Sequence, residues 1–240
     1  MIFATIVGVT LRALLGRRRT ILMLLLAGVP VLLGLLVRAN GSGVRDVGAT
    51  LDGLVVRVVL PLVALVFGTA ALGSELEDGT AVHILTKPIR RSTIVVAKIA
   101  VAGTLTAALL VPSTVIAGLL LARAGSSGQL SITFAMAIGV LVGSYVYVAI
   151  FVALSVATSR GLIIGLGYAL IWEGVLAGLL PGSQVFSVRE YVRGIAATLS
   201  PAAADSIVGT GAFLYAAVAF VAATAIASVR LAVYEIRGSD

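Results

Sequence analysis

Charged side chains are concentrated in one polar stretch, residues 74–98 (SELEDGTAVHILTKPIRRSTIVVAK), which separates two strongly apolar runs. Three acids open the stretch: Glu75, Glu77 and Asp78. Gly79 is expected to end the helix that carries them, because glycine is the usual residue after a helix C-terminus. Thr80 is suited to cap a second, short helix, whose first turn would then lie near the acids.

The second half of the stretch has the pattern of a short amphipathic helix followed by bases. Its apolar positions are Ala81, Val82, Ile84 and Leu85. Lys87 and Pro88 should end this helix, since proline cannot continue one. The bases that follow are expected at the level of lipid headgroups: Arg90, Arg91 and Lys98. An exposed apolar helix at a membrane surface is typical of a docking element; alternatively, the charges only anchor the flanking helices.

Two ionisable residues, Arg57 and Glu173, lie inside apolar runs. A charge within a membrane is costly and normally faces protein or a water-filled cavity. We expect Glu173, roughly 10 Å from the outer end of its run, to face inward and to pair with Arg57, within one subunit or across a dimer. Alternatively, Arg57 extends toward the interface while Glu173 is protonated or bonded to a neighbouring helix.

The sequence has no catalytic constellation. His83 is the single histidine and there is no cysteine, so no thiolate or histidine-built metal site is expected and no disulfide can form. The G-x-S-x-G and G-x-x-x-x-G-K-[ST] motifs are both missing. We therefore expect no enzyme activity in this chain, and any ATP hydrolysis linked to it must come from another chain.

The composition is that of a membrane protein. Of the 240 residues, 60% are hydrophobic and 11% charged, and the mean hydropathy is +1.17, whereas soluble domains are about 25% charged. The apolar runs are of helix length and do not alternate, which excludes a barrel. The net charge of +7 is therefore attributed to membrane orientation and not to nucleic-acid binding.

We predict an all-α, polytopic membrane protein formed by one domain over residues 1–240. The six predicted spans are residues 20–37, 54–73, 99–122, 132–158, 161–180 and 210–229. Residues 2–15 are expected to form an amphipathic helix on the inner surface, or else to extend the first span. Residues 181–208 are expected to form short amphipathic helices, with a helical patch over 188–199, at the outer interface.

The distribution of bases places both termini in the cytoplasm, as expected for a cell-membrane protein whose inner segments hold most of the Lys and Arg. Glycines spaced by four would allow close helix contacts, either within the subunit or in a dimer: Gly139 and Gly143, Gly161 and Gly165, Gly174 and Gly178. Four aromatic residues could line a path or pack in the interior: Tyr145, Tyr147, Tyr168 and Trp172.

Residues 74–98 resemble the first cytoplasmic loop of ABC type-2 permeases, which carry two acids before Gly-Thr, an apolar helix, and a Pro with bases. The matching positions are Glu75, Glu77, Gly79, Thr80, Leu85, Pro88, Arg91 and Lys98. The predicted layout of spans is also similar to that family over the whole chain. The loop helix would then be the coupling helix, which docks on an ATPase.

The resemblance implies a transport function. Two such subunits would form a homodimer or heterodimer in lipid, each docked on an ATP-binding-cassette ATPase that binds ATP and magnesium and drives export. A second hypothesis is an ion-coupled secondary transporter in which Glu173 carries a proton, although such carriers usually show internal repeats. A third is a non-transporting membrane scaffold.

Overall fold

The computed structural model describes residues 2–14, 16–40, 44, 46–77, 90–123, 126–158, 160–176, 183–200, 202–203 and 208–233. Within these ranges every regular element is a helix and no strand occurs. The predicted all-α fold is confirmed. A chain this apolar folds into helices because each helix satisfies its own backbone hydrogen bonds without help from water.

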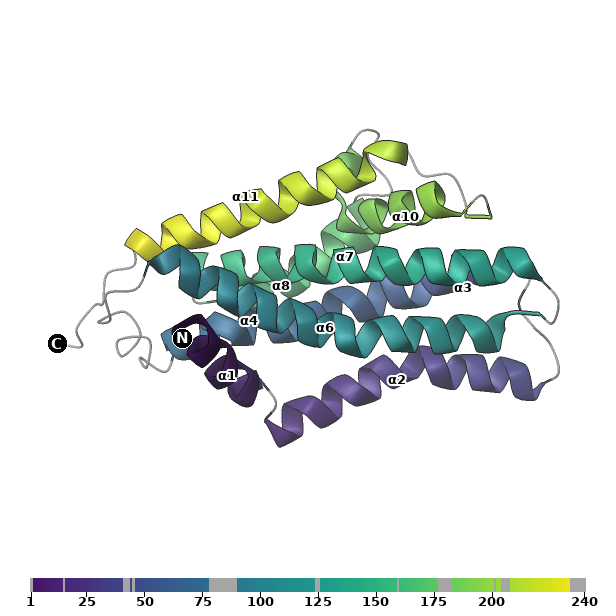
Figure 1. Cartoon of the computed structure of the whole chain (residues 1–240), viewed down its shortest axis with the longest axis horizontal. Helices are drawn as coiled ribbons and strands as arrows, with labels where there is room; N and C mark the ends of the chain where they lie inside the picture. Colours follow the sequence, from purple (N-terminus) through teal and green to yellow (C-terminus); the bar gives the residue numbers. More distant parts are fainter. Residues whose placement is uncertain are drawn as a thin grey trace.

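Four long helices are single elements: α2 (Arg17–Ala39), α6 (Arg91–Leu121), α7 (Ser127–Ala157) and α11 (Ala212–Val233). A fifth consists of α3 (Val47–Leu51), the π-helix η1 (Asp52–Val59) and α4 (Leu60–Glu77) in unbroken succession. Among the described residues, these five are long and apolar enough to cross a membrane. Figure 1 shows them running along the long axis of the molecule.

The predicted fifth span corresponds to α8 (Gly161–Gly167) and the π-helix η2 (Tyr168–Leu176). This helix is apolar but shorter than the other five. At 1.5 Å per residue it reaches about 24 Å, less than the hydrocarbon layer of about 30 Å. Its predicted end, residues 177–180, lies outside the described residues, so a sixth full span is not established by the helix itself.

Two helices extend beyond the predicted spans and include polar residues. The third span was predicted from residue 99, yet α6 begins at Arg91 and includes Lys98. The second was predicted from residue 54, whereas its helix begins at Val47 and includes Asp52. Prolines are likewise accommodated: Pro30 and Pro112 lie inside the continuous helices α2 and α6. Polar groups are tolerated within these helices where the interior supplies partners.

The N-terminal helix α1 (Ile2–Leu14) is separate from α2. Gly16, between them, has φ −55° and ψ 129°, which are not helical values, so α1 does not extend the first span. Thr10 and Leu14 are buried, and α1 packs against α6 and α4. In Figure 1 it lies across the end of the bundle that also holds the C-terminal end of α11; we call this the α1 end.

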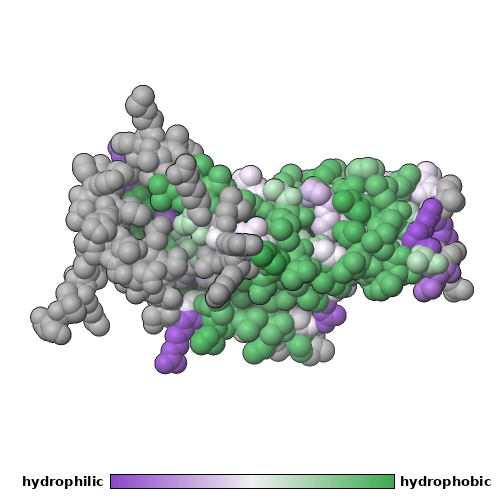
Figure 2. All heavy atoms as spheres, turned by 90° about the horizontal axis from the view of Figure 1, so that it is seen from below, coloured by the Kyte–Doolittle hydropathy of each residue, from purple (hydrophilic) through white to green (hydrophobic). Residues whose placement is uncertain are grey.

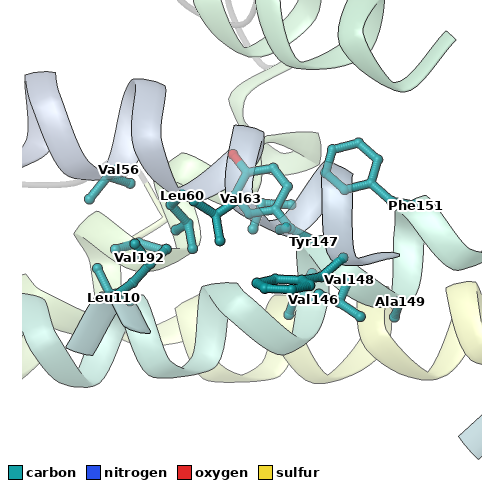
Figure 3. Packing of buried hydrophobic residues seen from close by; sticks show 14 of the residues in the cluster. Val56, Leu60, Val63, Leu110, Val146, Tyr147, Val148, Ala149, Phe151 and Val192 are labelled. Atoms are coloured by element: carbon teal, nitrogen blue, oxygen red, sulfur yellow. The ribbon is translucent and has the colours of Figure 1, made fainter. Parts of the chain in front are cut away.

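Helix α7 is the centre of the packing and contacts α4, α6, α8 and α11. Tyr147 and Phe151, one turn apart on α7, are both fully buried, with ring centroids 5.9 Å apart (Figure 3). Gly165 of α8 lies against Phe151 and against Leu65 of α4, where an added Cβ would lie 2.4 Å from a Leu65 carbon. This glycine pair, 161 and 165, therefore serves packing within the subunit.

The predicted helical patch at residues 188–199 is present as α10 (Val188–Leu199), preceded by the short 3-10 helix η3 (Ser183–Phe186). It packs against the bundle, and its place at the outer interface stays a prediction. Val192 is fully buried and sits against Gly139 and Gly143, near the middle of α7. Apolar residues three and four apart give α10 a hydrophobic face, and the two glycines provide the space that this face fills.

The surface is that of a membrane protein. Figure 2 shows a broad hydrophobic area, with hydrophilic residues most concentrated at one end. Many large apolar side chains are exposed, particularly along α2, where Leu25 and Leu36 are 67% and 64% exposed. Apolar patches of this extent are not found on monomeric soluble proteins. Helices of sufficient length and an apolar exterior together establish a multi-pass membrane protein.

Candidate functional site

The predicted docking stretch lies at the α1 end, between α4 and α6. Glu75 and Glu77 are in the last turn of α4, and Arg91 is the first residue of α6. Arg90, with extended backbone, precedes this helix and is exposed. Five predicted site residues lie outside the described residues: Asp78, Gly79, Thr80, Leu85 and Pro88. The short helix between α4 and α6 therefore remains a prediction.

Lys98 connects the two helices that flank this stretch. It was expected at headgroup level, but its side chain is 1% exposed, and its Nζ donates a hydrogen bond of 2.6 Å to the carbonyl oxygen of Ala71 in α4. Lys98 lies seven residues inside α6, about 10 Å from the helix start. Lys98 is therefore buried between α6 and α4 and bonds inside the protein, whereas its expected level in the membrane stays a prediction.

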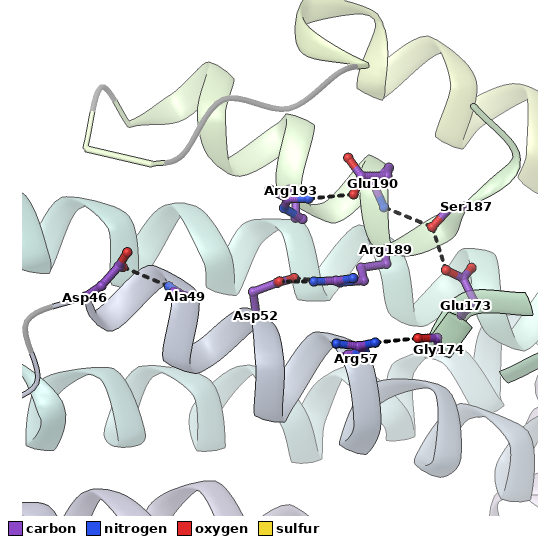
Figure 4. A network of polar contacts seen from close by, with 10 residues as sticks. All are labelled: Asp46, Ala49, Asp52, Arg57, Glu173, Gly174, Ser187, Arg189, Glu190 and Arg193. Carbon is purple, nitrogen blue, oxygen red and sulfur yellow. Dashed lines mark hydrogen bonds and ion pairs between the residues drawn. The ribbon is translucent and has the colours of Figure 1, made fainter. Parts of the chain in front are cut away.

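Polar side chains from η1, η2 and α10 meet toward the opposite end of the bundle (Figure 4). We call this group the α10 polar network; its ionisable members are Asp52, Arg57, Glu173, Arg189, Glu190 and Arg193. Arg189 of α10 holds the carboxylate of Asp52 in η1 by two hydrogen bonds, one from Nε at 3.1 Å and one from Nη2. The hydrogen bond with Asp52 raises the pKa of Arg189.

Glu173 of η2 forms hydrogen bonds with residues at the start of α10. It is 2% exposed, and its carboxylate accepts hydrogen bonds from the Ser187 hydroxyl at 2.5 Å, the Val188 backbone N–H at 2.8 Å and the Tyr168 hydroxyl at 3.1 Å. The N-terminus of a helix favours negative charge because its first N–H groups are unpaired. The alternative in which Glu173 bonds to a neighbouring segment is therefore the one observed.

Arg57 does not reach the Glu173 carboxylate. Its Nη2 donates instead to the backbone carbonyl of Gly174, and the side chain is exposed (Figure 4). No ion pair joins Arg57 and Glu173 within the described subunit, because the carboxylate points to α10 whereas the arginine lies on the outer surface of η1. A pair across a dimer stays a prediction.

The aromatic residues have defined packing or hydrogen-bonding roles. Tyr147 is fully buried in the interior, and Tyr168 donates to Glu173. Tyr145 shares a 2.9 Å hydrogen bond with Thr104, and Trp172 Nε1 donates to the carbonyl of Phe186 at 3.4 Å. These contacts favour the packing interpretation for Tyr147 and Tyr168.

The sequence analysis missed five members of the network: Asp52, Ser187, Arg189, Glu190 and Arg193. One sequence pattern could have indicated two of these residues. Ser187 and Glu190 have the Ser-x-x-Glu spacing of a capping box, and the Ser187 hydroxyl accepts from the Glu190 backbone N–H at 3.4 Å. Arg193 in turn contacts Glu190 at 2.7 Å. The link from Arg189 to Asp52 spans 137 positions, and no local pattern reveals it.

The described residues of the α10 polar network are arranged to solvate polar groups and do not have the arrangement of a catalytic site. A cavity of about 100 Å³ between α3, α7 and α10 has Asp52 and Arg193 in its wall, enough for about three waters at their liquid volume. In the part of the chain that the structure describes, no three His, Cys, Asp or Glu side chains are grouped to hold a metal ion.

Comparison with known protein families gives one match. Residues 15–175 match the family described as ABC-2 family transporter protein, about two-thirds of the chain. The matched region runs from the start of α2 to η2, and includes Lys98, Arg57 and Glu173; α10 and α11 lie beyond it. A search of curated proteins found no match. The chain thus belongs to the ABC-2 family of transporter proteins, and it is a multi-pass membrane protein of the permease type of ABC transporters.

Proposed function

We propose that the chain is the membrane subunit of an ATP-driven exporter, with the stretch of residues 74–98 as its docking site for a separate ATPase. The observation that carries this proposal is the Lys98–Ala71 hydrogen bond. It joins α4 and α6, the two helices that enter and leave the docking stretch, at a level inside the bundle. A displacement imposed on the stretch is thereby passed to both helices together.

The proposal includes six spans in one domain over residues 1–240. The helix from Gly161 to Leu176 becomes the fifth span if it continues to residue 180, since 20 residues of helix cover about 30 Å. With six spans, an even number, the two termini would lie on one side of the membrane.

The α1 end is proposed to be cytoplasmic. The bases at this end include Arg12 in α1, Arg17 at the start of α2, and exposed Arg90, Arg160 and Arg230, in keeping with the retention of Lys and Arg on the inner side. At the opposite end, bases and acids are mixed, and Arg189 and Arg193 bond to acids. Helix α1 would then lie along the inner surface, where its exposed apolar residues Val9 and Leu11 contact lipid.

The chain is proposed to have no enzyme activity and no cofactor of its own. The family implies a partnership with ATPase subunits in general. ATP and magnesium would bind to those subunits, because this sequence has no phosphate-binding loop. A second permease subunit would complete the transporter.

Substitutions in the docking stretch test the proposal. Glu77→Lys, Gly79→Pro and Leu85→Asp are expected to abolish transport and the stimulation of the ATPase, because they reverse charge, alter the helix start and remove the apolar contact. Membrane insertion should be unchanged. Arg230→Gln, an exposed base on α11 at the same end, is the control and should transport normally.

The outcome that rejects the proposal is transport by the purified chain with no ATPase present. That result would favour the secondary transporter. Normal transport by all three variants would remove the docking role from this stretch. Insertion without any measurable transport, with or without a co-purifying ATPase, would support a scaffold.

A further inference from the structure

Arg57 lies at a depth where a bare charge is costly. Its partner Gly174 follows Gly161, the start of the fifth helix, by thirteen residues, or about 20 Å of helix. In the proposed six-span arrangement, exposed Arg160, just before Gly161, would lie at the inner boundary. With a hydrocarbon layer of about 30 Å, the guanidinium would then lie roughly 10 Å from the outer boundary.

The arginine is held at this depth on an apolar surface. Its hydrogen bond to the Gly174 carbonyl directs it across to η2 and away from the headgroup region (Figure 4). Nearby in sequence on the same two helices, Val58, Ile171 and Val175 are 42%, 59% and 53% exposed. A backbone carbonyl does not neutralise a positive charge, and lipid chains cannot solvate it. We therefore expect an anion to bind next to Arg57 on this face.

Within one subunit, the acids whose side chains the structure describes do not supply that anion. Asp52 is bonded to Arg189, and Glu173 is buried and bonded to α10. Glu190 is 6% exposed and bonded to Arg193. Asp46 caps α3 at the far end of that helix. Each of these acids already has a partner within its own subunit, which favours an external anion for Arg57.

We propose that Arg57, together with the exposed apolar surface of η1 and η2, binds the negatively charged headgroup of an amphiphile. The planar guanidinium suits phosphate or carboxylate oxygens, while the apolar neighbours suit acyl chains. The amphiphile is an anionic lipid of the bilayer. Movement of the bound molecule by the proposed transport function is the other outcome that the last experiment tests.

The chain contains an intrinsic fluorescence probe close to this site. Trp172 is its single tryptophan, and it lies in η2, two residues before Gly174. Lipids brominated on their acyl chains quench tryptophan on contact. The purified protein is placed in phosphatidylcholine nanodiscs that contain increasing fractions of brominated phosphatidylglycerol or, in parallel, brominated phosphatidylcholine.

The anionic lipid should quench Trp172 at a mole fraction lower by about fivefold, the ratio expected for one accessible charge contact. Arg57→Gln should abolish this preference, whereas Arg57→Lys should retain most of it and shows that the fold is intact. Arg123→Gln, which removes an exposed base elsewhere on the outer side, should behave like the unaltered protein. Equal quenching by both lipids, or an unchanged preference in Arg57→Gln, would overturn the proposal.

Competition separates an amphiphile from a simple anion. Dodecyl phosphate should relieve the quenching by brominated phosphatidylglycerol, and inorganic phosphate at the same concentration should not. Relief by inorganic phosphate alone would refute the apolar part of the site. These measurements need neither ATP nor an ATPase, so they stand or fail independently of the export proposal.

The source of the anion is resolved in vesicles that hold the complete transporter and headgroup-labelled phosphatidylglycerol. If ATP changes the side of the membrane on which the label is accessible, the amphiphile is transported. If binding occurs without such a change, it is a resident lipid.

Discussion

The Nζ atom of Lys98 lies 2.6 Å from the carbonyl oxygen of Ala71 and joins α6 to α4 inside the protein. Ala71 is six residues before the end of α4, and Lys98 is seven residues after the start of α6. The bond thus joins the two helices at nearly the same distance from the docking stretch, six residues along α4 and seven along α6. The two helices can move there only as a pair while the bond is intact.

Replacement of Lys98 by Met should lower both stability and coupling. Loss of a buried hydrogen bond from a charged group costs about 2 kcal/mol, which thermal unfolding in detergent micelles would reveal. Transport per ATP hydrolysed should fall, because α4 and α6 respond separately to the ATPase. Arg90→Gln, at the exposed start of α6, is the control. Equal transport per ATP hydrolysed in the unaltered protein and in both variants would contradict the role assigned to Lys98.

Glu173 and Ser187 should act as one unit at the start of α10. Ser187→Ala removes the N-cap and should cost about 1 kcal/mol, and Glu173→Gln removes the charge from the helix N-terminus at a similar cost of about 1 kcal/mol. Because the two side chains share a hydrogen bond, the double variant should lose less than the sum. Trp172 fluorescence during thermal unfolding measures each value, and strict additivity would contradict the shared bond.

Gly139 and Gly143 should differ in their tolerance of alanine. A Cβ at Gly139 would lie 2.7 Å from the backbone oxygen of Val192, whereas one at Gly143 would meet side-chain carbons of Val192 and Leu60. Gly139→Ala should therefore destabilise by about 2 kcal/mol and Gly143→Ala by about 1 kcal/mol. Gly28→Ala, where nothing lies within 4 Å, should be neutral or stabilising.

A second substitution distinguishes backbone from side-chain obstruction at these glycines. Val192→Ala should restore stability to Gly143→Ala, since it removes the carbon that blocks the new methyl group. It should not rescue Gly139→Ala, where the backbone of α10 is the obstacle. Rescue of both variants, or of neither, would be inconsistent with the observed packing.

Double-mutant cycles of stability in the isolated subunit should differ between the pair Asp52 and Arg189 and the pair Arg57 and Glu173. Asp52→Asn and Arg189→Gln should be coupled by about 1 kcal/mol, as expected for a bidentate pair with partial exposure. Arg57→Gln and Glu173→Gln should be additive, because no bond joins their side chains. Coupling of Arg57 to Glu173 that appears only in the dimer would establish a pair across the subunits.

Hydropathy was sufficient to predict the helices and their order, because each span must satisfy its backbone within itself. It began the second span at residue 54, although the helix begins at Val47 and includes Asp52, since a window average treats a polar side chain as solvated and takes no account of an interior partner. The packing of α10 against the bundle was missed for the same reason: Arg189 finds its acid 137 positions away. The glycine spacing at 139 and 143 was noted correctly, but spacing alone does not identify the neighbour.

The position of Val192 between Gly139 and Gly143 also constrains how the chain assembles. Helix α10 contacts both α7 and α11, so we expect its packing to depend on the last helix. A chain truncated before Ala212 should insert its earlier spans but remain accessible to protease at α10.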